Sequence, residues 1–106
     1  MAKYLLEVTY TPEGIRGLRS EGGSARQAAA SELCESLGGA VESFYFAFGG
    51  TDVYVVADLP DDVSAAAAAL TVSAGGGATV RTVVLLSSAE LDAAAAKPVT
   101  YRPPGG

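Results

Sequence analysis

The sequence predicts an α+β domain of the ferredoxin-like type, a split β-α-β fold (βαββαβ) with one antiparallel four-stranded sheet and two covering helices. The main observation is a doubled pattern, because the order strand, helix, strand runs from Lys3 to Phe48 and again from Asp52 to Leu86. The two units join at a short connection, residues 49–52, that contains two glycines. A chain of 106 residues with 49% hydrophobic content provides one core and is too short for two.

The first unit opens with a strand over residues 3–10, where apolar and more mixed positions alternate with period two. Thr11 has the character of a helix N-cap, and Pro12 that of a first helical residue. The glycines that follow weaken any helix at this point. We therefore predict a short turn and an irregular loop over residues 11–23.

A helix follows this loop. Ser24, with Gln27 three residues later, has the pattern of a capping box, and the glycine pair 38–39 supplies the helix end. Ala-rich and Leu-containing positions at helical spacing give this segment one apolar face. The residues from Val41 to Phe48 are predicted to form the second strand.

The second unit repeats the order with a strand over residues 53–59, a helix that starts at Asp61 and Asp62, and a strand over residues 80–86. Carboxylates at a helix start are favourable because that end of the helix carries partial positive charge. Ser88 then offers an N-cap hydroxyl for a short, Ala-rich C-terminal helix.

The connection between the units determines which side chains face the core. A tight hairpin that pairs Phe48 with Val53 places three aromatic residues, Phe44, Phe46 and Phe48, on the core face. Right-handed crossovers put the first and third strands at the centre of the sheet and both helices on that same face. The opposite face of the sheet is therefore predicted to be bare.

The bare face is too apolar to remain in water and too polar for an ordinary core. Alternation assigns to it Leu5, Glu7, Thr9, Tyr45, Ala47, Asp52, Tyr54, Val56, Arg81, Val83 and Leu85. We expect the chain to associate with itself through this face, as a homodimer or a higher homo-oligomer. The residues expected at the centre of the interface are Leu5, Tyr45, Val56, Val83 and Leu85.

The topology also brings three connections to one edge of the sheet: the segment 11–23, the turn 49–52 and the turn 75–79. A pocket for a small molecule is expected at this edge. Its candidate ligand-binding residues are Arg16, Asp52, Tyr54 and Arg81. No catalytic residue is assigned.

Each of these four residues has a structural interpretation beside the functional one. Asp52 is either a general base or a carboxylate that closes a turn. Arg81 either holds an anionic substrate or pairs with Glu7 or Asp52 across the sheet. Arg16 either contributes to an anion site or lies in a solvated loop. Tyr54 is either an interface anchor or a proton donor.

The amino-acid composition excludes several classes of partner and reaction. The formal net charge of -5 disfavours nucleic acid, whose binding depends on Lys and Arg. No histidine is present, which excludes Ser-His-Asp, Cys-His and His-based metal chemistry. The acidic residues over 58–62 lack the spacing of a Ca²⁺ loop, so neither a metal nor a cofactor is predicted.

The compartment is predicted from cysteine usage and hydropathy. Cys34 is the single cysteine, which excludes an internal disulfide, and the chain does not open with a charged and apolar leader. The apolar runs are much shorter than the roughly 20 residues that a membrane helix needs. A cytoplasmic protein without a membrane span is therefore expected.

The sequence G-G-T-D at residues 49–52, followed by V-Y-V-V at 53–56 and P-D-D at 60–62, resembles the signature of the GYD-domain family. The flanking segments 10–15 and 77–82 fit the same pattern. The resemblance implies a ferredoxin-like fold of the dimeric α/β-barrel type, and it brings no established reaction.

Two features qualify the resemblance. Thr51 stands where the tyrosine that names the family usually lies, so a mechanism built on that phenol has no support here. The resemblance covers roughly Lys3 to Leu91, and the prolines and glycines from Lys97 onward are typical of a tail, so we expect a domain over residues 1–96 and a tail over residues 97–106.

Two classes of function agree with these features of the sequence. The first is a non-catalytic ligand-binding or assembly module, because no nucleophile–base pair is visible. The alternative is a cofactor-independent enzyme, like the monooxygenases and cyclases of related dimeric barrels. Its substrate would be a small aromatic or polyketide-like molecule, which Asp52 and Arg81 would polarise in an intersubunit cleft. An enzyme of this kind should enclose a cavity of roughly 300 Å³ or more that contains Asp52, whereas a binding or scaffold module should show a filled or shallow face.

Overall fold

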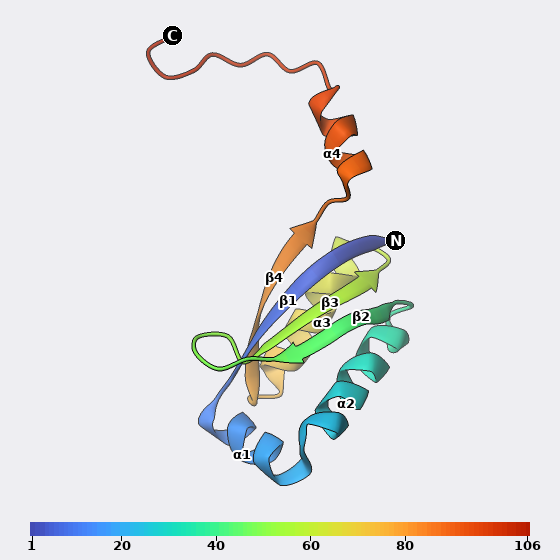
Figure 1. Cartoon of the computed structure of the whole chain (residues 1–106), viewed down its shortest axis with the longest axis vertical. Helices are drawn as coiled ribbons and strands as arrows, with labels where there is room; N and C mark the ends of the chain where they lie inside the picture. The colour runs from blue at the N-terminus through green and yellow to red at the C-terminus, as the bar shows by residue number, and fades with distance from the viewer.

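The computed structural model describes residues 1–106 as one antiparallel four-stranded sheet with four helices (Figure 1). The elements are β1 (Ala2–Tyr10), α1 (Pro12–Glu21), α2 (Gly23–Ser36), β2 (Ala40–Phe46), β3 (Val53–Leu59), α3 (Asp62–Ala74), β4 (Ala78–Leu85) and α4 (Ser88–Ala95). The strands lie in the order β2-β3-β1-β4, so β1 and β3 are central, as predicted. The α+β ferredoxin-like fold is confirmed.

Helix α1 corrects the predicted loop. The Thr11 hydroxyl accepts a hydrogen bond from the Gly14 N–H at 3.1 Å, and Pro12 takes the first helical turn. A glycine inside a helix costs only about 0.5–1 kcal/mol, which a good N-cap offsets. Glycine content alone was therefore too weak a signal to exclude this helix.

The start of α2 also differs from the prediction. The N-cap is Gly22, whose φ of 90° turns the chain from α1 into α2, and no side chain caps the helix. The capping box predicted between Ser24 and Gln27 is therefore wrong. Such a positive φ favours glycine, so the conformation of one residue fixes this junction.

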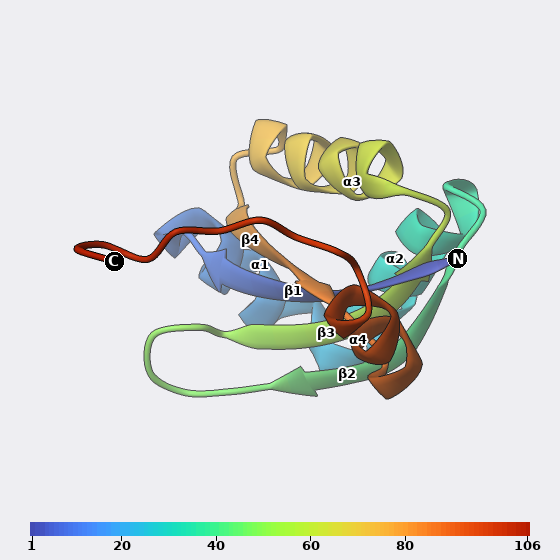
Figure 2. The same cartoon turned by 90° about the horizontal axis from the view of Figure 1, so that it is seen from above.

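The two larger helices share one face of the sheet. Helix α2 packs against β2 and helix α3 against β4, while the opposite face carries no helix (Figure 2). The core between the helices and the sheet consists of Tyr4, Leu6, Cys34, Val53, Val55, Ala57, Leu59 and Ala65. Alternate residues of β3 are buried, as its period-two pattern predicted.

The β2–β3 connection is longer than a tight hairpin. Strand β2 ends at Phe46, which pairs with Val53, and a bulge interrupts the strand between Val41 and Ser43. Phe48 is fully exposed in the loop, so its predicted place in the core is wrong.

The N-termini of the last two helices, α3 and α4, are capped by side chains. Asp61 accepts a hydrogen bond from the Ser64 N–H at 2.8 Å at the start of α3, which lowers the pKa of the Asp61 carboxyl. At α4 the N-cap is Ser87, one residue before the predicted Ser88, and it forms a capping box with Glu90.

None of the helices has the length and apolar character that crossing a bilayer requires.

The last part of the chain leaves the packed body (Figure 1). Every residue from Leu86 to Gly106 is exposed, including all of α4. We call residues 86–106 the C-terminal arm. The domain end expected at residue 96 stays a prediction, because α4 is helical but does not pack against its own sheet.

Tyr4 joins the central strand to the start of α3 and gives a prediction about pH. Its ring is 1% exposed, and its hydroxyl donates to Asp62 Oδ1 at 2.6 Å. This hydrogen bond, with burial, raises the pKa of Tyr4 from 10.0 to about 12. Because the folded pKa is raised, the contribution of the neutral phenol is complete below about pH 10 and is lost as the pH rises towards about 12.

We therefore expect Tyr4→Phe to be less stable than the wild type near neutral pH, with a difference that shrinks through this alkaline window. Urea unfolding followed by circular dichroism at several pH values measures both curves. If the stability of both proteins fell in parallel between pH 10 and 12, the loss would belong to other groups and the role of Tyr4 would be wrong.

Candidate functional site

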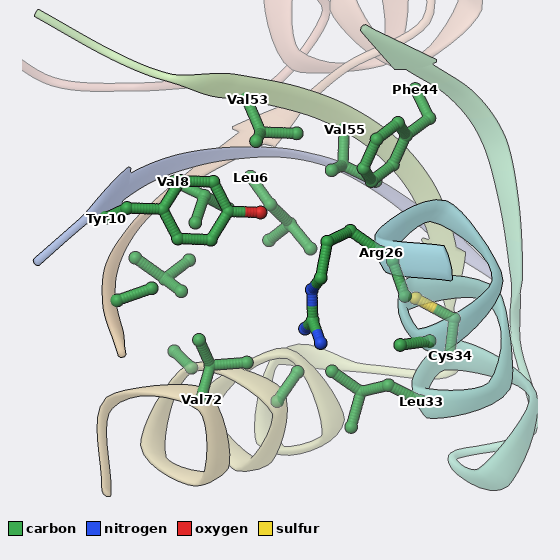
Figure 3. Close-up of a pocket in the computed structure, with 16 residues that line it drawn as sticks. Leu6, Val8, Tyr10, Arg26, Leu33, Cys34, Phe44, Val53, Val55 and Val72 are labelled. Atoms are coloured by element: carbon green, nitrogen blue, oxygen red, sulfur yellow. The ribbon is translucent and has the colours of Figure 1, made fainter. Parts of the chain in front are cut away.

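A cavity of about 100 Å³ lies between the sheet and the helices that cover it (Figure 3). It forms because α2 packs towards the β2 edge and α3 towards β4, so the centre of the sheet lies between them. Both helices present small side chains to this space, Ala29 and Ala30 from α2 and Ala68 and Ala69 from α3. The floor is apolar and comes from β1, β3 and β4.

Two polar groups reach into this apolar cavity. Of its 16 lining residues 15 are hydrophobic, and Arg26 is the exception. Figure 3 shows the Arg26 guanidinium and the Tyr10 hydroxyl directed into the space between sheet and helices. Cys34 also lines the cavity, but burial and the neighbouring Glu35 raise the pKa of its thiol, so it remains a protonated, apolar wall.

The cavity adjoins an outer hollow of about 330 Å³ between α1 and the end of α3. Four residues line both spaces: Tyr10, Arg26, Val72 and Ala78. The outer hollow is more polar, and Glu21 in its wall lies 3.3 Å from Arg26, measured from Oε1 to Nη1. Arg26 therefore stands at the boundary between the apolar interior and a polar mouth.

The outer hollow lies at the edge where three connections were expected to meet. The Thr11 N–H donates to the Gly77 carbonyl at 2.9 Å, which joins α1 to the turn before β4. The Asp52 N–H donates to the Val8 carbonyl at 2.9 Å, which joins the β2–β3 loop to the same edge. The three connections are therefore neighbours, as predicted.

The four residues predicted to bind a ligand do not form one site. The Asp52 carboxylate accepts a hydrogen bond from the Tyr10 N–H at 2.8 Å, so it closes a turn, and it lines an open groove of about 370 Å³. Arg81 and Tyr54 flank Glu7 in one row of the open face, which is the bare sheet face that carries no helix. Arg81 Nε lies 3.8 Å from Glu7 Oε2. Arg16 is exposed on α1 and lines no hollow.

The bare sheet face carries the predicted interface residues. Val56, Leu5 and Val83 lie side by side across β3, β1 and β4, and each is only half-buried. Leu85 extends this apolar stripe along β4. Tyr45, on the opposite edge strand β2, pairs with Tyr54 in the neighbouring row and is 71% exposed. Their contact with a partner stays a prediction.

Charged groups border this stripe at one end of the sheet. Lys3 Nζ lies 2.9 Å from Asp58 Oδ1 and 3.1 Å from Glu42 Oε1. All three side chains are substantially exposed, so these ion pairs contribute little to stability. No group of three or more acidic or cysteine side chains is arranged to hold a metal ion.

Arg26 is the residue that the sequence interpretation missed, although a signal was present. It precedes Ala29, Ala30 and Leu33 at helical spacing, so it continues the apolar face of α2. A lone cation on an apolar helix face is a candidate for a role in a pocket.

The fold and the site define a ferredoxin-like domain with an apolar cavity under its helices and an uncovered sheet face. The family model of the GYD domain matches residues 4–95 of the 106-residue chain. The chain belongs to the GYD domain family, as its G-G-T-D segment suggested. No curated protein and no solved structure matches the chain significantly.

Proposed function

We propose that this chain is a small-ligand-binding module that takes an apolar ligand into the cavity between α2, α3 and the sheet. The observation that carries the proposal is an apolar cavity with one guanidinium at its boundary. Ligand pockets are typically apolar with a few placed polar groups, and a cavity of about 150 Å³ in another protein binds benzene. A longer ligand can extend into the outer hollow.

We further propose that two copies pair through the uncovered sheet face. A second copy would remove the apolar stripe of Leu5, Val56 and Val83 from water. The C-terminal arm continues past the end of β4 with every residue exposed, so it offers further surface to a second copy. Its exposed apolar side chains include Leu91 and Tyr101.

A cofactor-independent enzyme is less well supported. No carboxylate lines the inner cavity. Asp52 instead lines a groove of about 370 Å³ that is open to solvent, whereas the enzyme hypothesis calls for an enclosed cavity around this residue. Of the two residues assigned to that mechanism, Asp52 is occupied by the hydrogen bond from the Tyr10 N–H, whereas Arg81 is 80% exposed and makes only a weak 3.8 Å contact with Glu7. We also propose a cytoplasmic protein, because a single buried free thiol fits a reducing compartment. The net charge of -5 supports a protein without a nucleic-acid partner.

Filling the cavity tests ligand binding. Ala69 lines the cavity, so Ala69→Leu is expected to weaken binding of benzyl alcohol at least about tenfold by occupying its space. Ala66 is exposed on the same helix, and Ala66→Leu is expected to bind like the wild type. Two-dimensional NMR titration of methyl resonances gives the affinity and the location, and thermal unfolding confirms that both variants fold.

The proposal predicts saturable shifts at Leu33 and Val72, which line the cavity. Shifts confined to Val56 and Val83 on the open face, or no saturable response in the wild type, would contradict it.

A further inference from the structure

We infer that the ligand is a small apolar monocarboxylic acid whose carboxylate is held by Arg26 and Tyr10. This inference rests on the proposed function and specifies the chemical class of its ligand. The acid would place its alkyl or aryl body in the cavity and its charged group at the boundary with the outer hollow.

Arg26 has unused capacity for an anion. A guanidinium carries five N–H donors in a planar fork that matches a carboxylate with two parallel hydrogen bonds. Within the chain it contacts one carboxylate, Glu21, through one nitrogen at 3.3 Å, and the two side chains are 40% and 43% exposed. A single long contact between exposed groups is weak, so an incoming carboxylate can replace it.

Tyr10 supplies a second donor at the same boundary. Its hydroxyl has no hydrogen-bond partner within the chain, and it is directed into the cavity (Figure 3). Its backbone is fixed, because its N–H donates to the Asp52 carboxylate at 2.8 Å. Tyr10 is therefore held in place at the strand end while its phenol remains available.

The residues around Arg26 favour a ligand with one negative charge over a ligand with two. Glu21 is the only acidic residue that lines either space, and Arg26 is the only basic one. A monocarboxylate that displaces Glu21 from Arg26 leaves the guanidinium with one directly bound carboxylate, as before. A dicarboxylate or a phosphate would bring a second negative charge to a site with no further cation.

The test compares octanoate with 1-octanol, which has the same chain length and no charge. Wild-type protein is expected to bind octanoate about tenfold more tightly, since a charge-assisted bidentate contact is stronger than a neutral one. Arg26→Met keeps the apolar stem and is expected to lose this preference while it still binds 1-octanol. NMR titration of the full chain gives both affinities.

Glu21→Gln tests the inference in the opposite direction. Removal of the competing carboxylate should tighten octanoate binding about threefold and leave 1-octanol binding unchanged. Glu32→Gln is the matched control, because Glu32 is exposed on α2 and lines neither space. It is expected to bind both probes like the wild type.

The outcomes separate the two proposals. Equal binding of octanoate and 1-octanol to the wild type, or no response of octanoate affinity to Glu21→Gln, overturns the carboxylate inference and leaves the apolar cavity as a binding site. Failure of both probes to bind the wild type overturns the proposed function, and the inference falls with it.

Discussion

Gly14→Ala is expected to destabilise the protein by about 2 to 3 kcal/mol, because the added methyl group would overlap the backbone of another segment. A Cβ built on Gly14 would lie 1.9 Å from the carbonyl oxygen of Gly77. That oxygen already accepts the Thr11 N–H at 2.9 Å, so the turn cannot move without breaking the hydrogen bond. Relief of the overlap must displace α1 from the end of β4, next to the mouth of the cavity.

Gly17→Ala is the matched control on the same helix. A Cβ at Gly17 meets nothing within 4 Å, and alanine is the better helix former. We therefore expect this variant to be more stable than the wild type by about 0.5 to 1 kcal/mol. Urea unfolding followed by circular dichroism should give effects of opposite sign, and a Gly14→Ala variant as stable as the wild type would show that α1 does not dock against Gly77.

Val56→Asp is expected to convert the proposed dimer into a monomer, with a dimer dissociation constant raised at least about 100-fold, because an unpaired charge would be buried in the interface. Val56 lies on the central strand β3, beside Leu5, in the middle of the apolar stripe. The side chain is only half-buried within one copy, so the folded monomer should tolerate the carboxylate.

Val63→Asp makes the same chemical change on α3, where the side chain is 77% exposed. It should leave the dimer intact, because that helix covers the other face of the sheet. Sedimentation velocity over a range of concentrations compares both variants with the wild type. A monomeric wild-type protein at every concentration, or equal behaviour of the two variants, would show that the sheet face is not the interface.

The strands and their order could be predicted because period-two alternation and right-handed crossovers are local or general rules. Strand β3 agrees with its prediction at both ends. The start of helix α1 was visible in Thr11 and Pro12, but the glycines were given more weight than this cap, and the contact with Gly77 that positions the helix is not visible in the sequence. This contact joins specific atoms, which composition does not reveal.

Phe48 shows where a correct local pattern fails. The alternation of phenylalanines continues past the end of β2, but the sheet pairing stops at Phe46. The loop that follows is tied to the end of β1 by the hydrogen bond between the Asp52 carboxylate and the Tyr10 N–H. This contact joins residues 42 positions apart in the sequence, so period-two reasoning could not place it.

The candidate site was predictable in part. The turn-closing interpretation of Asp52 and the pairing of Arg81 with Glu7 are both found, because turn preference and strand register decide them. The cavity itself depends on how far α2 and α3 lie apart on the sheet, which no local pattern specifies. The charge of Arg26 on an apolar helix face was the one sequence feature that indicated a pocket, and the sequence interpretation did not use it.

The location of a bound ligand is the most direct test of the proposed binding site. In isotope-edited NMR of the octanoate complex, we predict intermolecular NOEs from the alkyl chain to the methyl groups of Leu33 and Val72, which face the cavity from α2 and α3. NOEs to Val56 and Val83 alone would place the ligand on the open sheet face and contradict a cavity site.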